Sequence, residues 1–96
     1  MLIDFSTDIL DLSGEPILDA AEKTLKLGAL SVNAIMTPKS ALSGEENVKR
    51  LGLALRINAG GEIEVTPEEA ALIKKCAAEA FLSPLIVGRM FEALNG

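Results

Sequence analysis

The sequence contains no histidine, tryptophan or tyrosine, and its 96 residues include a single cysteine, Cys76. Histidine is the side chain that most often transfers protons at neutral pH, and it also activates serine and cysteine nucleophiles. A zinc tetrad cannot be assembled from one thiol and no imidazole. One cysteine forms no internal disulfide, so nothing in the sequence requires an oxidising compartment. We therefore expect no enzymatic activity, no metal site and no cofactor.

Positive charge is also scarce, because 9 Lys and Arg residues stand against 14 Asp and Glu residues, for a net charge of −5. The adjacent basic pairs, Lys49-Arg50 and Lys74-Lys75, lie among glutamates on predicted helices, where ordinary ion pairing on a solvated face explains them. Neutralising nucleic-acid phosphates needs a clustered field of Lys and Arg, and single strands usually stack on aromatic side chains. We expect no direct binding of nucleic acid.

Long apolar segments are missing too. The longest uncharged stretches, 27–38 and 80–88, are shorter than the roughly 20 residues that a membrane-spanning helix needs. The N-terminus lacks the basic and then apolar pattern that is typical of a secretory signal. These features favour a cytoplasmic protein without a membrane partner.

Aliphatic side chains are what the sequence has in excess. Hydrophobic residues make up 49% of the chain, but aromatic residues only 3%. A chain of this length builds one modest core, so we expect a single domain over residues 1–96 with an aliphatic interior. Two explanations of the high apolar share are open: part of it faces a partner or a second copy of the chain, or small alanines lie on helix surfaces.

Three N-cap signals predict the helical body of the protein. Ser43 and Thr66 are each followed three residues later by a glutamate, Glu46 and Glu69, so that hydroxyl and carboxylate can satisfy backbone N–H groups reciprocally in a capping box. Ser83-Pro84 opens the last helix, because the residue before proline is pushed out of the helical region. With the terminators Pro38 and Gly60-Gly61, the predicted helices cover residues 27–37, 44–58, 67–82 and 84–95.

Apolar residues at helical spacing predict which face of each helix is buried. The predicted core positions are Val48, Leu51 and Leu55, widened by Leu53 and Ile57, in the second helix, and Ala70, Ile73, Ala77 and Phe81 in the third. Cys76 lies beside the stripe of the third helix, so we expect a buried, inert thiol.

In residues 1–18 the apolar residues form shorter groups than in the predicted helices. Their apolar residues, bounded by Ser13-Gly14, suggest short strands with a hairpin around this turn. The alternation Glu62-Ile63-Glu64-Val65 is typical of a half-buried strand, which is a suitable partner for the N-terminal segment. We identify no internal repeat. The predicted fold is mainly α: a compact bundle of about four short helices with a small N-terminal β-hairpin or short sheet.

Acidic residues recur in the N-terminal segment, at Asp4, Asp8, Asp11, Glu15 and Asp19. Their spacing does not fit an EF-hand loop, which needs oxygen ligands at alternate positions around a central glycine. We interpret them as a solvated acidic edge, with recognition of a basic partner as the alternative.

The last predicted helix is apolar around more of its circumference than a one-sided surface helix requires, so it lies centrally or part of it meets a partner. Gly88 suggests close approach of another helix or strand, because glycine in a helix costs about 1 kcal/mol relative to alanine. Arg89 is then placed to reach an acidic group, or it stays solvated. The predicted interaction residues are Leu85, Ile86, Val87, Arg89, Met90 and Phe91.

Several ordered segments together resemble a known class of proteins. They are Ile3-Asp4-Phe5, Asp11-Leu12-x-Gly14, Leu25-x-Leu27-Gly28, Ser43-Gly44-Glu45-Glu46, Glu68-Glu69-x-Ala71-Leu72-Ile73-Lys74-Lys75 and Ser83-Pro84-Leu85-Ile86-Val87-Gly88. In this order they resemble small proteins encoded by tailed bacteriophages and prophages. The resemblance implies a viral origin and a bacterial host cytoplasm, and it carries no catalytic motif.

The leading hypothesis from the sequence is a phage-encoded, non-enzymatic protein that binds a host or viral protein, for instance as an inhibitor of a bacterial host defence protein. Its motivation is the missing catalytic groups, the negative charge suited to basic nucleic-acid-binding surfaces, and the apolar last helix. A phage tail-assembly chaperone or structural adaptor is the alternative. A protein that sequesters a small ligand, such as a nucleotide signal, is a third, although few cationic groups converge. A homo-oligomer is compatible with each.

Overall fold

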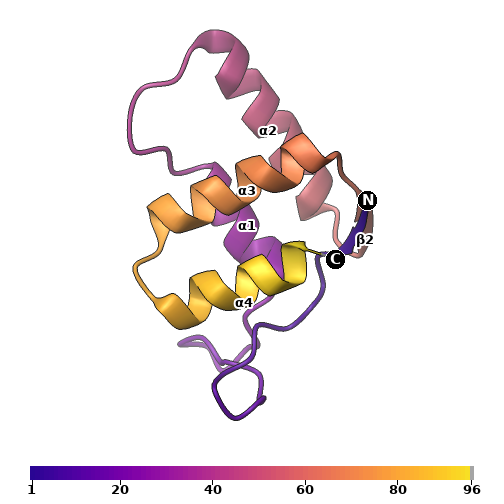
Figure 1. Ribbon diagram of the computed structural model, residues 1–96, viewed down its shortest axis with the longest axis vertical. Coiled ribbons are helices and arrows are strands. Elements are labelled where there is room, and N and C mark those ends of the chain that lie inside the picture. Colours follow the sequence, from indigo (N-terminus) through magenta and orange to yellow (C-terminus); the bar gives the residue numbers. More distant parts are fainter. Residues whose placement is uncertain (96) are drawn as a thin grey trace.

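The computed structural model describes residues 1–95 of the chain. Within this range the helices are α1 (Leu27–Ile35), α2 (Gly44–Asn58), α3 (Pro67–Ala80) and α4 (Pro84–Leu94), as Figure 1 shows. Strands β1 (Leu2–Asp4) and β2 (Glu62–Glu64) pair antiparallel, with Ile3 opposite Ile63. The predicted fold class, mainly α with a short N-terminal sheet, is confirmed.

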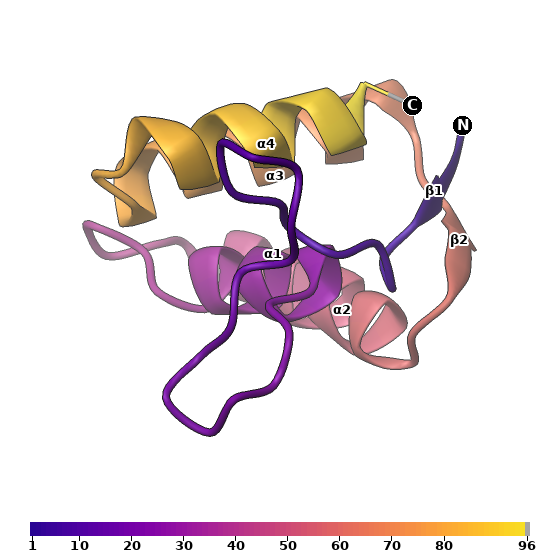
Figure 2. The ribbon, with the colours of Figure 1, turned by 90° about the horizontal axis from the view of Figure 1, so that it is seen from below.

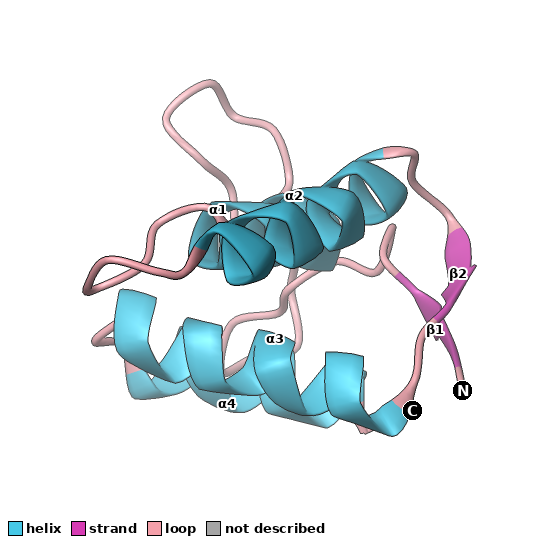
Figure 3. Ribbon diagram, turned by 90° about the horizontal axis from the view of Figure 1, so that it is seen from above, coloured by secondary structure: helices cyan, strands magenta, loops and turns pink. Residues whose placement is uncertain are grey.

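The helices form two layers. Figures 2 and 3 show α1 with α2 in one layer and α3 with α4 in the other, and α3 packs on α1 between the layers. The enclosed core is mainly aliphatic, as the composition predicts. Its largest fully buried side chains include Phe5, Ile9, Leu27, Ile35, Ile57, Ile73, Met90 and Leu94.

The helix starts follow the predicted caps, with one difference. At α3 the Thr66 hydroxyl accepts from Glu69 N (3.0 Å) and the Glu69 carboxylate accepts from Thr66 N (2.9 Å), which completes a capping box. At α2 the Ser43 hydroxyl accepts from Glu46 N (3.1 Å), but Glu46 does not reach back to the Ser43 backbone. The predicted box at Ser43 is therefore wrong in its second half, because the Glu46 side chain lines a cavity between α2 and α3 instead.

The face that α2 turns to the core is only in part the predicted one, since Leu53 and Ile57, two of its predicted core residues, are buried. Its buried residues are Arg50, Leu53, Ala54 and Ile57. Val48, Leu51 and Leu55, which were predicted to be buried, are 72%, 47% and 62% exposed. Since two opposite faces of α2 carry aliphatic residues at helical spacing, tertiary contacts decide between them. Here Arg50 Nη1 donates to the Ile35 carbonyl (3.4 Å), at the C-terminal end of α1.

The first turn of α1 packs directly on the N-terminal segment. Its N-cap residue, Lys26, makes no side-chain cap, and the N–H of Leu27 donates to the Thr7 carbonyl (2.9 Å). The N–H of Gly28 donates to the Phe5 carbonyl (2.8 Å). A Cβ at Gly28 would lie 2.9 Å from that same carbonyl oxygen, a distance at which the backbone must move. Glycine is therefore required here by the close approach of the Phe5 carbonyl and not by the φ angle of Gly28.

We expect Gly28→Ala to lower the free energy of unfolding by about 1–3 kcal/mol. The added methyl group would press against a backbone carbonyl, which cannot move aside as a flexible side chain can. Gly52→Ala is the matched control, since Gly52 is also helical and a Cβ there would have no neighbour within 4 Å. Gly52→Ala should raise the free energy of unfolding by as much as about 1 kcal/mol, because alanine has a higher helix propensity than glycine. Urea unfolding measures both, and equal effects of the two substitutions would contradict the close contact.

Arg56 connects α2 to the last residue of β2 and to the first turn of α3. Its Nη1 donates to the Glu69 carboxylate (2.6 Å) and its Nη2 donates to the Glu64 carbonyl (2.6 Å). The hydrogen bond from Arg56, followed by the bond from Thr66 N, holds the pKa of Glu69 below its ordinary value. The ionised Glu69 thus supports both the helix cap and the contact between the layers.

Because the pKa of Glu69 is lowered in the folded state, its contribution to stability is present above the unfolded-state pKa and is lost as the pH falls through the folded-state pKa. We expect Glu69→Gln to lower the free energy of unfolding by about 1–2 kcal/mol at pH 7 and to reduce its further fall under acid. Unfolding curves between neutral pH and about pH 3 test this. Glu79→Gln, which removes an exposed carboxylate outside these contacts, should keep the wild-type acid dependence.

Candidate functional site

Residues 8–26, here called the N-terminal arm, connect β1 to α1 and contain two matching turns. In the first turn the Asp11 carboxylate accepts from the backbone N–H groups two and four residues later, at 2.8 and 3.0 Å. Asp19 does the same in the second turn, at the same two distances. The turns also match in backbone angle, because Gly14 (φ 84°) and Glu22 (φ 60°) both have positive φ at the third position after the aspartate.

A ring of three backbone hydrogen bonds holds the arm together. Ile17 N donates to the Ile9 carbonyl (2.9 Å), and Leu25 N donates to the Ile17 carbonyl (2.8 Å). Ile9 N donates to the Leu25 carbonyl (2.9 Å), which closes the ring. The three positions stand eight residues apart, as do the two Ile-Leu-Asp triplets that begin at Ile9 and Ile17. The sequence interpretation that found no repeat was therefore wrong, and the repeated triplet was the available signal.

The acidic residues of this segment are tied into local structure. The Ser6 hydroxyl and then the Ser6 backbone N–H hold the pKa of Asp4 below its ordinary value. A hydrogen bond from the Lys26 ammonium lowers the pKa of Asp8. Among residues 1–95 no group of three or more carboxylate, thiol or imidazole side chains is arranged to hold a metal ion. The aspartates thus build turns and one ion pair, and Glu15 is exposed.

Arg89 fastens α4 to the first turn of the arm. Its Nε donates to the Leu10 carbonyl (3.1 Å) and its Nη2 donates to the Asp11 carbonyl (2.8 Å). Its Nη1 pairs with Glu92 on the same helix (3.1 Å). Of the two predicted alternatives, reaching across to an acidic group or staying solvated, neither describes the contact, because Arg89 crosses to backbone carbonyls. Its donors position the arm.

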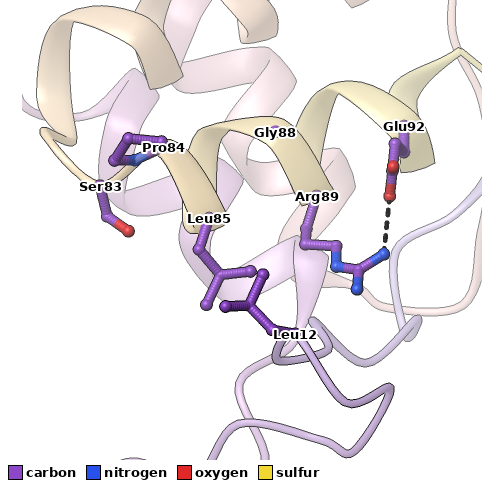
Figure 4. Close-up of a pocket in the computed structure, with 7 residues that line it drawn as sticks. All are labelled: Leu12, Ser83, Pro84, Leu85, Gly88, Arg89 and Glu92. Atoms are coloured by element: carbon purple, nitrogen blue, oxygen red, sulfur yellow. Dashed lines mark hydrogen bonds and ion pairs between the residues drawn. The ribbon is translucent and has the colours of Figure 1, made fainter.

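An open groove of about 600 Å³ lies beside this anchor, between the first turn of the arm and α4 (Figure 4). We call it the α4 groove. It is lined by Leu12, Ser83, Pro84, Leu85, Gly88, Arg89 and Glu92. In Figure 4, Leu12 from the arm and Leu85 from α4 point toward one another. Leu12 is 88% exposed and the adjoining Leu82 is 97% exposed, so this end of the molecule presents aliphatic side chains to solvent.

The predicted interaction residues divide between this groove and the core. Leu85 and Arg89 line the groove. Met90 is fully buried, and Ile86 is half-buried and packs against the core, so both side chains contribute to the fold.

The remaining two, Val87 and Phe91, are half-buried. The Lys74 ammonium lies 5.8 Å from the centre of the Phe91 ring, within the range of a cation–π contact. Of the six predicted interaction residues, only Leu85 and Arg89 therefore lie together in the α4 groove.

Gly88 does not have the predicted role. A Cβ at this position would have no neighbour within 4 Å, so no other element approaches it closely. Its missing side chain instead leaves space in the α4 groove. Leu12, Pro84 and Glu92 were also not predicted as site residues. For Leu12 the available signal was a leucine at the tip of a Ser-Gly turn, where nothing in the turn buries it.

A second apolar surface lies on α2. Val48, Leu51 and Leu55 form an exposed stripe at spacings of three and four residues, here called the α2 stripe. Gly52 lies on the same face and is also exposed. Contiguous exposed aliphatic side chains of this kind mark interaction surfaces more often than isolated ones do.

Cys76 has the predicted character. It is 2% exposed, and burial raises the pKa of its thiol. A thiol of raised pKa carries little thiolate at neutral pH, so Cys76 is a poor nucleophile.

Comparison with known proteins adds no functional assignment. No protein-family model matches the chain, and no curated protein or solved structure shows significant similarity to it. In the described part of the chain, no helix has both the length and the hydropathy needed to cross a bilayer.

We expect Arg89→Ala to release the first turn of the arm from α4, because two backbone carbonyls lose a charged donor. The free energy of unfolding should fall by about 1–3 kcal/mol. Hydrogen exchange at the Asp11 amide, which bonds to the Glu15 carbonyl in the turn, should accelerate. Glu92→Gln keeps both bonds to the arm and should change stability by less than about 0.5 kcal/mol. Unchanged exchange at Asp11 in the Arg89 variant would contradict the anchoring role.

Proposed function

We propose that this chain is a phage-encoded, non-enzymatic binding protein that acts in the cytoplasm of a bacterial host. Its α4 groove takes a segment of a host or viral protein, for instance a bacterial defence protein that it inhibits. The phage origin rests on the resemblance of the ordered segments described above. The single observation that supports binding at this place is an open, largely aliphatic groove whose two walls are joined by Arg89.

The joined walls favour binding because they are positioned before the partner arrives. Association must offset the entropy of ordering loops and side chains, and a turn that is already held by two charge-assisted hydrogen bonds has less freedom to lose. Leu12 and Leu85 supply apolar contact from the arm and from α4, and Gly88 leaves the lining open at its own position. A volume of about 600 Å³ lies within the usual size range of ligand pockets, so it accommodates a few side chains rather than a whole domain.

The charge around the groove indicates the chemistry of the partner segment. Glu15 is exposed in the turn beside the groove, whereas Glu92 and Arg89, which line the groove, pair with one another. Arg89 is occupied by the arm and by Glu92, so it offers little to a partner carboxylate. The fitting segment therefore carries an aliphatic anchor next to Lys or Arg. The net charge of −5 steers such a basic segment toward the protein.

The α2 stripe favours a second candidate, a tail-assembly chaperone or structural adaptor. It shares no residue with the α4 groove, so the chain presents two separate apolar surfaces. An adaptor needs two such surfaces in order to hold two components together. In this alternative a viral protein occupies one surface, and another component or a second copy of the chain occupies the other.

Filling the groove tests the proposal. Gly88→Leu places a side chain in the groove, and no neighbour lies within 4 Å of its Cβ position, so the fold should tolerate it. The wild type and the variant are immobilised, and proteins captured from phage-infected or prophage-bearing bacteria at physiological salt are quantified by mass spectrometry. We expect the specific partner to fall at least about tenfold with the variant, equivalent to 1.4 kcal/mol.

Gly52→Leu is the matched control, because it adds the same side chain to an exposed helical glycine on α2. The captured partner should be retained by this variant and should carry a basic segment with an aliphatic anchor. A partner lost with Gly52→Leu and kept with Gly88→Leu would move the binding surface to the α2 stripe and support the adaptor. Equal capture by all three proteins would overturn the α4 groove as the binding site.

A further inference from the structure

A cavity of about 490 Å³ lies between α2 and α3 and shares no lining residue with the α4 groove. Lys49, Arg50 and Lys75 contribute three positive charges to its lining, and Glu46 and Glu68 contribute two negative ones. The cavity thus carries one positive charge in excess on a protein whose net charge is −5. The remaining lining, Leu42, Ala71 and Leu72, is apolar.

Arg50 is the unusual member of this lining. It is 8% exposed, and within the described residues the one hydrogen bond of its side chain is the long contact to the Ile35 carbonyl (3.4 Å). Its Nε is buried without a partner. None of the ion pairs among residues 1–95 involves Arg50. A guanidinium has five N–H donors and stays charged, so a buried one without a counter-ion carries a large desolvation cost.

The nearby glutamates do not remove this imbalance. Glu46 stands one helical turn before Arg50 and lines the same cavity, yet the two side chains form no ion pair within 4.0 Å. Glu68, on α3, likewise makes no ion pair among the described residues. The cavity is therefore lined by a buried guanidinium, that of Arg50, that has no ion-pair partner among the described residues.

We propose that this cavity binds a small oxyanion, a phosphate or carboxylate group. The buried charge of Arg50 attracts the anion, and the exposed Lys49 and Lys75 donate to its oxygens. The apolar side of the cavity, including Leu72, contacts the organic part of a molecule that bears the group. This site is independent of the α4 groove, so the failure of one leaves the other standing.

Amide chemical-shift titration by NMR tests the site, with inorganic phosphate in one series and acetate in another. Sodium chloride keeps the ionic strength constant in both series, so that general screening does not mimic binding. We expect saturable shifts confined to residues 46–50 and 68–76, with a dissociation constant of about 1 mM for at least one anion. Shifts that stay linear, or that spread over the whole surface, would overturn the proposal.

Variants with matched charge changes separate specific pairing from general electrostatics. Lys75→Gln should weaken binding about threefold or more, whereas Lys23→Gln, which removes the same charge from the second turn of the arm, should leave it unchanged. Glu46→Gln should tighten binding, because it removes from the cavity lining a negative charge that repels the anion. Equal effects of the two lysine variants would overturn the site. So would weaker binding by Glu46→Gln in protein with unchanged thermal stability.

Discussion

The hydrogen bonds from the first turn of α1 to the N-terminal segment are the contacts on which the rest of the structure depends. α1 has no side-chain N-cap, and the carbonyls of Thr7 and Phe5 take that role for Leu27 and Gly28. An unsatisfied N–H group at a buried helix end is costly, so these bonds fix where the N-terminal segment crosses α1. That crossing sets β1 beside β2 and leads the arm toward α4, where Arg89 receives it.

The helical body was predictable because its signals are local. Thr66-Pro67 and Ser83-Pro84 fix helix starts through the cap and the proline ring, without reference to distant residues. The burial of α2 was not predictable in this way. Its two apolar faces satisfy the helical period equally, and the choice between them depends on contacts with α1, such as that between Arg50 and the Ile35 carbonyl. The ring in the arm did have a signal in the sequence, the Ile-Leu-Asp triplet that recurs after eight residues, but the backbone bonds that close the ring are visible only in the structure.

The same difference between local signals and tertiary contacts holds for the candidate sites. Leu85 was predicted as an interaction residue because the last helix carries more apolar surface than one face requires, and Arg89 was predicted because it follows Gly88. Gly88 was misread, since a helical glycine is compatible both with a close neighbour and with an open space. The cavity beside Arg50 joins residues of α3 with residues of α2, whose buried face was predicted only in part, so no linear pattern could bring Lys49 and Lys75 together.

The shape of the arm is set by main-chain bonds and by the carboxylates of Asp11 and Asp19, not by burial of the side chains at its tips. Leu12 stands at such a tip and still forms one wall of the α4 groove. Substitution there alters what the wall offers without disturbing the framework that carries it. Sequence variation at this position can therefore accumulate while foldability is preserved, as it does at exposed loop tips in general.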